Sequence, residues 1–449
     1  MINVLRFKRC IVQSALEGKL SNRDSNDGNV DLLTKYLFKR NKKYAAFSND
    51  LIEFNIPNEW RWCMLYEAVS LENGTPISDN KLPYLEVKYL RTGLNPTIME
   101  SGDLVEPGDK VILVDGENSG EIFPVLERGY RGSTFKVLRI SNAFISEYVQ
   151  YFISVYKEKF RGNKTGSAIP HLNKTLFFEL PIPLPPIEEQ RRIVERLNSI
   201  FRELDKVEKS QDSLLSLQSS LENKTIELAL QGKLVKQVNE EGTSEEYFNL
   251  IQSARNRLIK CGKAKKYDEQ KIDLNDAPFE IPESWKWVYL GSIFNHNAGK
   301  ALNNSDKEGT ELEYITTSNV YSDHFELNHL KRMFFKESEI EKCTIRKGDL
   351  LVLEGGDIGR AAIWNEDYEM RIQNHIHKLR PFYEIETEFF YYLLNYFKNN
   401  QLINGKGIGL QGLSSNKLHF LVVPLPPLNE QRRIVTQLKS ILLECKKIV

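Results

Sequence analysis

The segments that could do chemistry include two glycine-rich loops. Residues 354–359 (EGGDIG) follow an apolar run, as a nucleotide loop does, but a Rossmann fingerprint needs GxGxxG at the start of a helix, and no helical pattern follows here. The sequence has no GxxxxGK followed by Ser or Thr, which excludes a P-loop motor. Residues 405–409 (GKGIG) could pass for a methyl-donor loop, yet no Asn/Asp-Pro-Pro-aromatic motif accompanies them. Neither loop predicts a nucleotide or methyl-transfer site.

The titratable residues also form no catalytic or metal-binding set. His375 and His377 alternate along a predicted strand, but without an adjacent carboxylate or third histidine they are better interpreted as structural residues than as metal ligands. A nuclease would need clustered carboxylates with a lysine at short spacing, and Asp109 and Asp115 have no such lysine. We therefore predict a chain with no catalytic residues and no metal site.

The composition is typical of a soluble globular protein. Of 449 residues, 41% are hydrophobic and 27% are charged, and the length suffices for two or three domains. Five scattered cysteines disfavour disulfides and zinc sites, and the start of the chain lacks the apolar stretch of a signal peptide, so we expect a cytoplasmic protein. Lys+Arg and Asp+Glu each number 61, which alone argues against binding nucleic acid through overall basicity.

The chain contains a large internal repeat. Three motifs recur in the same order, and the longest matches at ten of twelve positions. The pairs are PLPPIEEQRRIV at 183–194 with PLPPLNEQRRIV at 424–435, FNIPNEWRW at 54–62 with FEIPESWKW at 279–287, and ALEGKL at 15–20 with ALQGKL at 229–234. A repeat of this length is a duplicated domain-sized module.

The two copies follow each other in a circular order. The first QRRIV leads through a long helical stretch to ALQGKL, whereas the second is followed by the end of the chain, and its matching ALEGKL stands at the N-terminus. We predict an α+β protein with two duplicated mixed α/β domains, separated by two long antiparallel coiled-coil helices in a circular pseudo-two-fold arrangement. The expected parts are an N-terminal helix completing the second arm (1–20), a first domain (21–185), a central long helix (186–232), a second domain (233–426) and a C-terminal long helix (427–449).

The central helix is predicted from a stretch without glycine or proline between residues 187 and 231. Apolar residues there alternate by four and three positions, the pattern of a coiled-coil seam. The seam residues are Ile193, Leu197, Ile200, Leu204, Val207, Leu214, Leu221 and Leu228, continued in the C-terminal copy by Ile434, Leu438, Ile441, Cys445 and Ile448, and at the N-terminus by Val4, Phe7 and Ile11.

Each module has the same order of segments. A charged segment precedes IPxxW, which opens a strand; a Gly-Asp turn, an apolar strand and a helical run follow, and a glycine-rich loop stands before PLPP. The paired tryptophans could stack on bases, but core positions in a strand are favoured. Two diverged modules on a long helix suit an elongated ligand, and duplex DNA, whose half-sites recur about every 10 bp on one face, is such a ligand.

These motifs resemble the DNA-specificity subunit of type I restriction-modification systems over essentially the whole chain. The resemblance rests on the doubled PLPPxxEQRRIV motif, the circular duplication, GTP at 74–76, the Gly-Asp-strand-Gly pattern and the ALxGKL helix end. It implies that each module is a target-recognition domain for one half of a split DNA site. It also implies two methyltransferase subunits docked on the helices, together with restriction motor-nuclease subunits. S-adenosylmethionine, ATP and Mg are expected in those partners, and no cofactor is expected in this chain.

The resemblance also implies which loops face DNA. The residues carried over by motif are Gly74, Thr75, Pro76, Lys164, Thr165 and His171 in the first module, and Gly299, Lys300, Lys406, Gly407 and Gln411 in the second. Gly299 and Lys300 stand where the first copy has GTP, so this module departs from the pattern there.

Two other classes of function remain open at this stage. A protein-interaction scaffold with two diverged modules would leave no DNA footprint in any assembly. A stand-alone nuclease would show metal-dependent cleavage by the purified chain.

Overall fold

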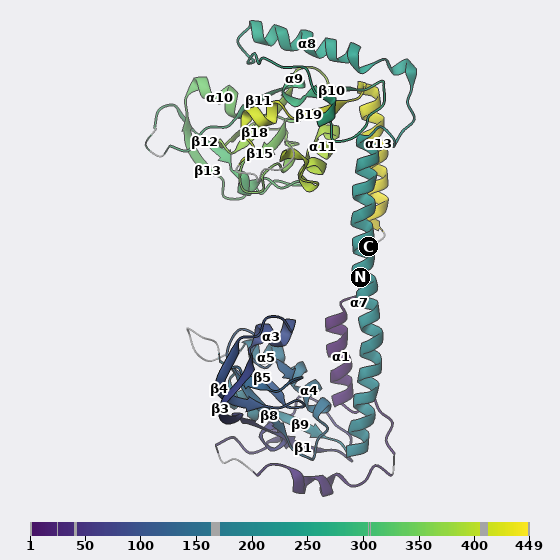
Figure 1. Ribbon diagram of the computed structural model, residues 1–449, viewed down its shortest axis with the longest axis vertical. Coiled ribbons are helices and arrows are strands. Elements are labelled where there is room, and N and C mark those ends of the chain that lie inside the picture. The colour runs from purple at the N-terminus through teal and green to yellow at the C-terminus, as the bar shows by residue number, and fades with distance from the viewer. Residues whose placement is uncertain are drawn as a thin grey trace. The chain divides into compact units, whose positions relative to one another are not determined.

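The computed structural model describes residues 2–447 apart from Ser25, 40–42, 163–170, Asn304, Asp306 and 405–411. The chain forms two compact units, residues 1–212 and 213–449, each holding one copy of the repeat (Figure 1). Helix α7 (Ile187–Leu230) contributes its first half to the first unit and its second half to the second. The predicted central helix is therefore present, spanning 187–230 where 186–232 was expected.

The first unit is built around a four-stranded antiparallel sheet in the order β2-β8-β5-β6. Strands β3, β4 and β7 pair with one another in a closed arrangement, and β1 and β9 form a separate ribbon. The helices are α1 (Val4–Leu16), α2 (Leu65–Ala68), α3 (Val87–Thr92), α4 (Ser146–Val155), α5 (Lys157–Gly162) and α6 (Lys174–Phe178). The strands are β1 (Arg61–Met64), β2 (Val69–Glu72), β3 (Thr75–Leu85), β4 (Ile98–Val105), β5 (Lys110–Leu113), β6 (Ile122–Pro124), β7 (Gly129–Arg131), β8 (Phe135–Ile140) and β9 (Pro181–Leu184).

The second unit repeats this plan. Its sheet β11-β18-β15-β16 has the strand order of the first, beside a second sheet β13-β12-β17-β14 and a ribbon of β10 and β19. The helices are α8 (Ser244–Lys260), α9 (Leu290–Ile293), α10 (Glu337–Cys343), α11 (Thr387–Asn399), α12 (Ser415–His419) and α13 (Leu428–Lys447). The strands are β10 (Lys286–Tyr289), β11 (Phe294–Ala298), β12 (Thr310–Ile315), β13 (Lys331–Phe335), β14 (Thr344–Ile345), β15 (Leu350–Leu353), β16 (Ala361–Ile363), β17 (Met370–Ile372), β18 (Ile376–Pro381) and β19 (Val422–Leu425). The matching order confirms the duplication at the level of the fold.

The repeated motifs form the same elements in both units. IPxxW leads into β1 and β10, whose partners β9 and β19 carry the first proline of each PLPP motif, Pro183 and Pro424. Trp60 and Trp285 are buried, which confirms the core interpretation for the first tryptophan of each pair, whereas Trp62 and Trp287 are half-buried. The Gly-Asp turns precede β5 and β15, as predicted. Helix α8 was not predicted within the charged segment, although Thr243 and Glu246 form the capping box that starts it.

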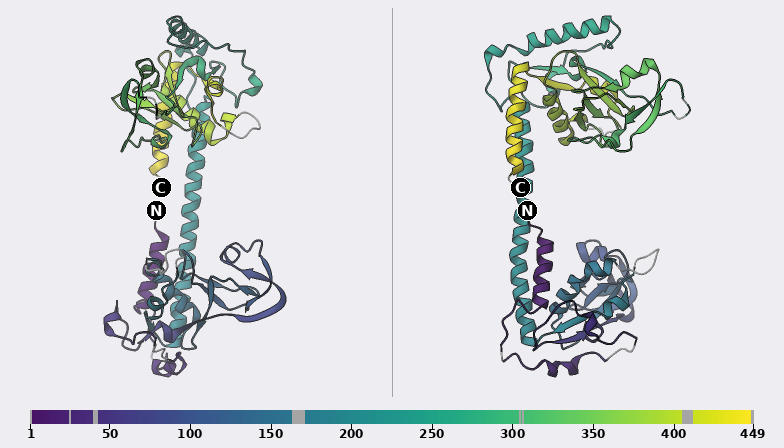
Figure 2. Two further views of the ribbon diagram at one scale, coloured as in Figure 1. Left: turned by 90° about the vertical axis from the view of Figure 1, so that its left-hand side faces the viewer. Right: turned by 180° about the vertical axis from the view of Figure 1, so that it is seen from behind.

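Shorter helices cover each half of α7 (Figure 2). In the first unit α1 runs antiparallel to α7, since Lys8 pairs with Asp205 while the Gln211 side-chain amide donates to the Ile2 carbonyl. In the second unit α13 packs on α7 through a core that contains Ala229 and Ile434. This is the predicted antiparallel pairing, seen here within each unit.

Burial along α7 follows most of the predicted seam. Ile193, Leu197, Leu204, Ile434 and Leu438 are buried, and Ile200, Val207, Leu214, Leu228 and Ile441 are half-buried. Val4 and Cys445 are also buried and Ile11 is half-buried, whereas Ile448 lies outside the described residues.

The seam prediction is wrong for Leu221 and its counterpart Phe7, which are 47% and 52% exposed. A helix with 3.6 residues per turn drifts about 20° per heptad, so a strict four-three ladder started at Ile193 turns about 80° off the packed face after four heptads. Near the end of α7 the ladder position Thr225 is buried, while Ala229, one residue beyond the half-buried ladder position Leu228, is fully buried.

The PLPPxxEQ motif fixes the start of each long helix. Gln190 is fully buried; its amide donates to the carbonyls of Ala143 and Pro185, and its oxygen accepts from the Ile145 amide. The buried carboxylate of Glu189 accepts from the Trp60 indole at 2.8 Å. The amide of Gln431, the counterpart of Gln190, donates to the Pro426 carbonyl.

The ALxGKL motifs end in glycines that the fold requires. Gly18 and Gly232 adopt φ of +72° and +68°, and a Cβ at either would lie 2.4 Å from a carbon of the proline in IPxxW, Pro57 or Pro282. Left-handed backbone and lack of space both exclude a side chain there.

We expect Gly18→Ala and Gly232→Ala to lower the free energy of unfolding of the first and second unit by more than Gly262→Ala. Gly262 has φ +67°, and no other atom lies within 4 Å of the point that its Cβ would occupy, so its substitution costs only the left-handed strain of about 1–2 kcal/mol. The clash at the other two adds about 1–3 kcal/mol. Urea unfolding with hydrogen exchange read separately for each unit measures the difference, and equal losses for all three variants would contradict it.

Candidate nucleic-acid interface

Two of the segments predicted to face DNA, residues 74–76 and His171, lie at one end of the sheet in the first unit. Because neighbouring strands are antiparallel, the end of β2, the end of β5 and the start of β8 share this edge. The chain returns to the same edge after the glycine-rich loop, where His171 bridges Asp115 and the Leu172 amide donates to the Val114 carbonyl at 2.7 Å. We call the loops at this end of each sheet the reading edge.

Close backbone contact explains the glycines of the reading edge. A Cβ at Gly74 would lie 2.3 Å from the Leu104 carbonyl oxygen, and one at Gly299 would lie 2.0 Å from that of Ile372. Thr75 and Pro76 beside Gly74 are exposed. The glycines let the chain cross closely to the neighbouring strands, and the exposed side chains next to them are left to face a ligand.

His171 has a defined orientation on the reading edge. Its Nδ1 lies 2.6 Å from Asp115 Oδ1, and its side chain is 50% exposed. A small hollow of about 350 Å³ opens beside it, lined also by Asn173 and Lys174. The carboxylate fixes the imidazole while the ring stays accessible, as a side chain that reads a base edge requires.

The second unit builds its reading edge from the same strand ends. Gly299 follows β11, Gly355 follows β15 and the exposed His375 precedes β18, while the Leu413 amide returns to the Glu354 carbonyl at 3.5 Å. His377 is buried and approaches the Leu413 carbonyl at 2.9 Å through Nε2. His377 is thus a structural residue, as the sequence indicated, whereas His375 faces outward on the edge.

Lys300 is turned inward. Its side chain is 9% exposed, and its Nζ lies 2.7 Å from Glu339 Oε2 and 5.8 Å from the centre of the Phe335 ring. The structure therefore gives Lys300 an intramolecular partner in place of the exposed position that a phosphate contact needs.

The remaining predicted residues lie outside the described part of the chain. These are Lys164, Thr165, Lys406, Gly407 and Gln411. The sequence reasoning missed the exposed Lys174, which begins α6, and it considered His375 only as a metal ligand. The asparagine cap of α6 was the available signal that Lys174 begins a helix at the edge.

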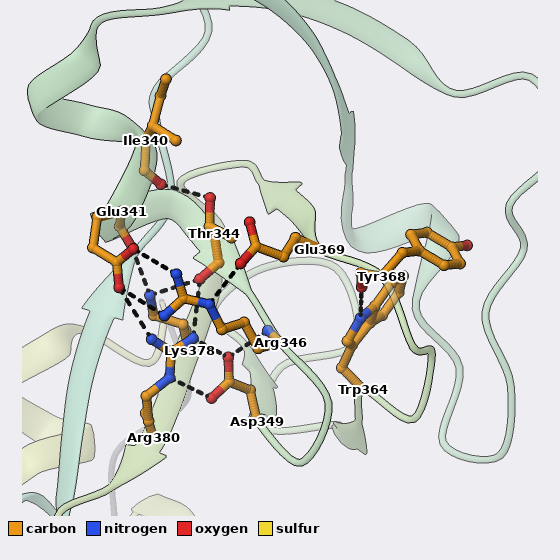
Figure 3. A network of polar contacts seen from close by, with 10 residues as sticks. All are labelled: Ile340, Glu341, Thr344, Arg346, Asp349, Trp364, Tyr368, Glu369, Lys378 and Arg380. Carbon is orange, nitrogen blue, oxygen red and sulfur yellow. Dashed lines mark hydrogen bonds and ion pairs between the residues drawn. The ribbon is translucent and has the colours of Figure 1, made fainter.

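A buried charge network holds the second unit's two sheets together (Figure 3). Lys378 on β18 is 3% exposed and donates to the carbonyls of Thr344 at 2.8 Å and Glu341 at 3.2 Å; burial lowers the pKa of its ammonium to about 8. Next to it Arg380 pairs with Asp349 at 2.6 Å. The network joins β18 and the turn before β15 to α10 and β14, so it stiffens the body that carries the reading edge.

A second polar cluster fastens α8 and the segment after it to the same unit. His419 Nε2 lies 3.0 Å from Glu269, Glu269 forms a two-pronged ion pair with Arg255, and His419 Nδ1 lies 3.3 Å from His296 Nε2. Tyr267 stacks on His419 with ring centres 3.7 Å apart. Burial, followed by the nearby His419, lowers the pKa of His296 to about 4.

The first unit fills the equivalent space with apolar groups. Tyr44 packs on Phe178 with ring centres 4.9 Å apart, where the second unit has Tyr267 on His419. Leu71 on β2 takes the place of His296 on β11, as the strand registers show. Histidine side chains in this packed space are therefore a feature of the second unit.

Within the described residues no group of three or more His, Cys, Asp or Glu is placed to hold a metal ion. Among the same residues, none of the helices has both the length and the apolar character needed to cross a membrane.

Comparison with known proteins identifies the family of this chain. The model of the type I restriction modification DNA specificity domain matches residues 64–214 and 282–448, one match for each copy. The chain belongs to this DNA specificity family. It is 22% identical to the type I restriction enzyme EcoAI specificity subunit of Escherichia coli, over 100% of this chain and 90% of that protein. It is 26% identical to the MjaVIII specificity subunit of Methanocaldococcus jannaschii, over 87% and 88%.

A solved structure supports the fold assignment. A chain from a study of complex assembly and conformational transition of the type I R-M system superposes with a TM-score of 0.60 at 20% identity, covering 88% of this chain and 93% of that one. The fold of this specificity-family member is thus found in a solved structure, and the chain is a DNA-recognition subunit of the type I class.

The histidine cluster makes the stability of the second unit of this specificity subunit depend on pH. The usual pKa of histidine is about 6.5, and that of His296 in the folded chain is about 4. Between pH 6.5 and 4, His296 therefore binds a proton in the unfolded chain but stays neutral in the folded chain. Stability is full above pH 6.5 and falls by about 3 kcal/mol as the pH drops through this window.

Hydrogen exchange of β11 and α12, corrected for intrinsic rates, measures this loss. His296→Leu, which introduces the residue of the first unit, is expected to flatten the pH dependence, and β2 of the first unit is the internal control. An unchanged pH slope in the variant would assign the loss to other groups.

Proposed function

We propose that this chain reads a bipartite double-stranded DNA sequence, with each unit recognising one half. The observation that supports the proposal is that both units form the same edge of the sheet but place different side chains on it. Thr134 in the first unit and His375 in the second precede equivalent strands, and His171 is matched by Gly412. Different donors and acceptors at equivalent places are what two unrelated half-sites require.

We further propose that the chain has no catalytic role and acts with partner subunits. Methyltransferase subunits, two in number, would modify adenine with S-adenosylmethionine, and restriction subunits would use ATP and Mg. Support comes from apolar side chains on the long helices that the units themselves leave exposed. Leu5 and Phe7 are 78% and 52% exposed in the first unit, and Leu217 and Leu443 are 67% and 58% exposed in the second. Exposed apolar residues on a helix are typical of a docking surface.

The bipartite reading is tested by mapping methylated adenines in cells that carry the system. We expect one split sequence, with His171→Ala relaxing bases in one half and His375→Ala relaxing bases in the other. The loss of a base contact costs about 1–3 kcal/mol, a factor of roughly 5–150 in discrimination at that base.

The two histidine variants serve as controls for each other because each should leave the opposite half unchanged. Relaxation of both halves by either variant would indicate general loss of structure instead. Methylation of all sequences alike, or the absence of a DNA footprint in the assembled complex, would favour the protein-interaction scaffold.

A further inference from the structure

A basic groove lies in the first unit between α1 and the junction of α4 with α5. The groove has a volume of about 520 Å³, and its charged lining residues are Arg6, Arg9, Glu53 and Lys159. Arg6, Arg9 and Gln13 are spaced by three and four positions, which places them on one face of α1. Glu53 is engaged by Lys159 at 2.7 Å. The two arginines therefore contribute positive charge that the groove's own carboxylate does not neutralise.

The arginines are not explained by the stability of α1. Both are exposed, and among the described residues neither guanidinium has an ion-pair partner. They stand in the first two turns of α1, which has no acidic residue in its first turn. A cation in the first turn of a helix opposes the helix dipole, and Arg6 stands in that turn. An anionic ligand would offset this unfavourable interaction.

The groove is joined to the reading edge of the same unit. Helix α5 lines the groove with Lys159, and its next residues reach the edge: Phe160 packs beside Gly120, and Arg161 Nη2 donates to Asn118 Oδ1 at 2.5 Å. Six helical residues rise about 9 Å, which corresponds to two or three base pairs of duplex. Helix α5 thus links the lining of the groove to the reading edge over a length comparable to a few phosphates of duplex.

The second unit lacks this charge. At the positions that match Arg6 and Arg9 it has Ser220 and Asn223, and the two following positions of this face hold Lys224 and Glu227, which pair with each other at 2.9 Å. The difference between these matching helix faces indicates a task that only the first unit performs.

We propose that Arg6 and Arg9 bind backbone phosphates of the DNA next to the half-site read by the first unit. Guanidinium groups suit phosphate because their planar donors can bind two oxygens at once. The contact carries no sequence information; it supplies grip and sets the register of the first unit on the duplex. This inference rests on the proposed function, since it needs DNA on the reading edge.

The test uses the full chain assembled with its methyltransferase subunits and a duplex containing the mapped sequence. Each phosphate contact contributes about 0.9 to the slope of log K against log salt concentration. We expect Arg6→Gln/Arg9→Gln to reduce the slope by about 1–2 and to weaken binding about tenfold or more near 0.15 M salt, with the methylated sequence unchanged. Ethylation interference should disappear at phosphates beside one half-site only.

Two control variants separate this role from general effects of charge. Arg196→Gln/Arg202→Gln removes two exposed arginines from α7 in the same unit and is expected to leave the slope unchanged. Arg6→Lys/Arg9→Lys keeps both charges and should keep the slope.

The contrary outcomes are distinct. An unaltered slope in Arg6→Gln/Arg9→Gln, or a slope lost equally in the lysine variant, would overturn the phosphate contact. Loss of complex assembly with normal salt dependence would overturn it in favour of an acidic partner protein. Absence of sequence-specific binding by the wild-type complex would instead contradict the proposed function.

Discussion

The fold depends on the docking of a buried Glu-Gln pair at the start of each long helix. An amide or carboxylate removed from water is unfavourable unless its hydrogen bonds are replaced, and here they are replaced by groups from separate parts of the unit. Gln190 joins the loop before α4 to the first turn of α7, and Glu189 joins the helix to Trp60 and to Ser21. In the second unit burial raises the pKa of the equivalent Glu430, which accepts from Gln237 at 2.5 Å. Helix, sheet and N-terminal segment are thereby held in one orientation.

The docking continues one turn along each helix. Arg192 pairs with Asp27 in the first unit, and Arg433 pairs with Glu241 at 2.6 Å in the second. These contacts account for the Glu, the Gln and the second Arg of the EQRR segment, which is identical in both copies. The reading edges are not held by such a buried pair, so their side chains can differ between the two units.

Much of the fold could be predicted from the sequence by rules that concern neighbouring residues. The long helix, the strands entered through IPxxW and the Gly-Asp turns follow from residues close together in the chain. Lys300 shows where this reasoning ends: its partner Glu339 comes from an element that no local pattern places beside it. Phe7 and Leu221 show that a heptad pattern fixes the helix but not the face that its neighbours cover. The candidate contacts on the glycine-rich loops stay predictions, because Lys164 and Lys406 lie outside the described residues.

The contact of His419 with Gly291 has a consequence for how such chains can vary. A Cβ at Gly291 would lie 1.9 Å from His419 Nδ1, so the imidazole occupies the volume that any side chain at position 291 would need. The first unit solves the same packing problem in the opposite way, with Tyr66 and Phe178 both against Tyr44. A change at one of these paired positions leaves either a void or an overlap that only the other can correct. Positions 291 and 419 should therefore covary among relatives, although they lie far apart in the chain.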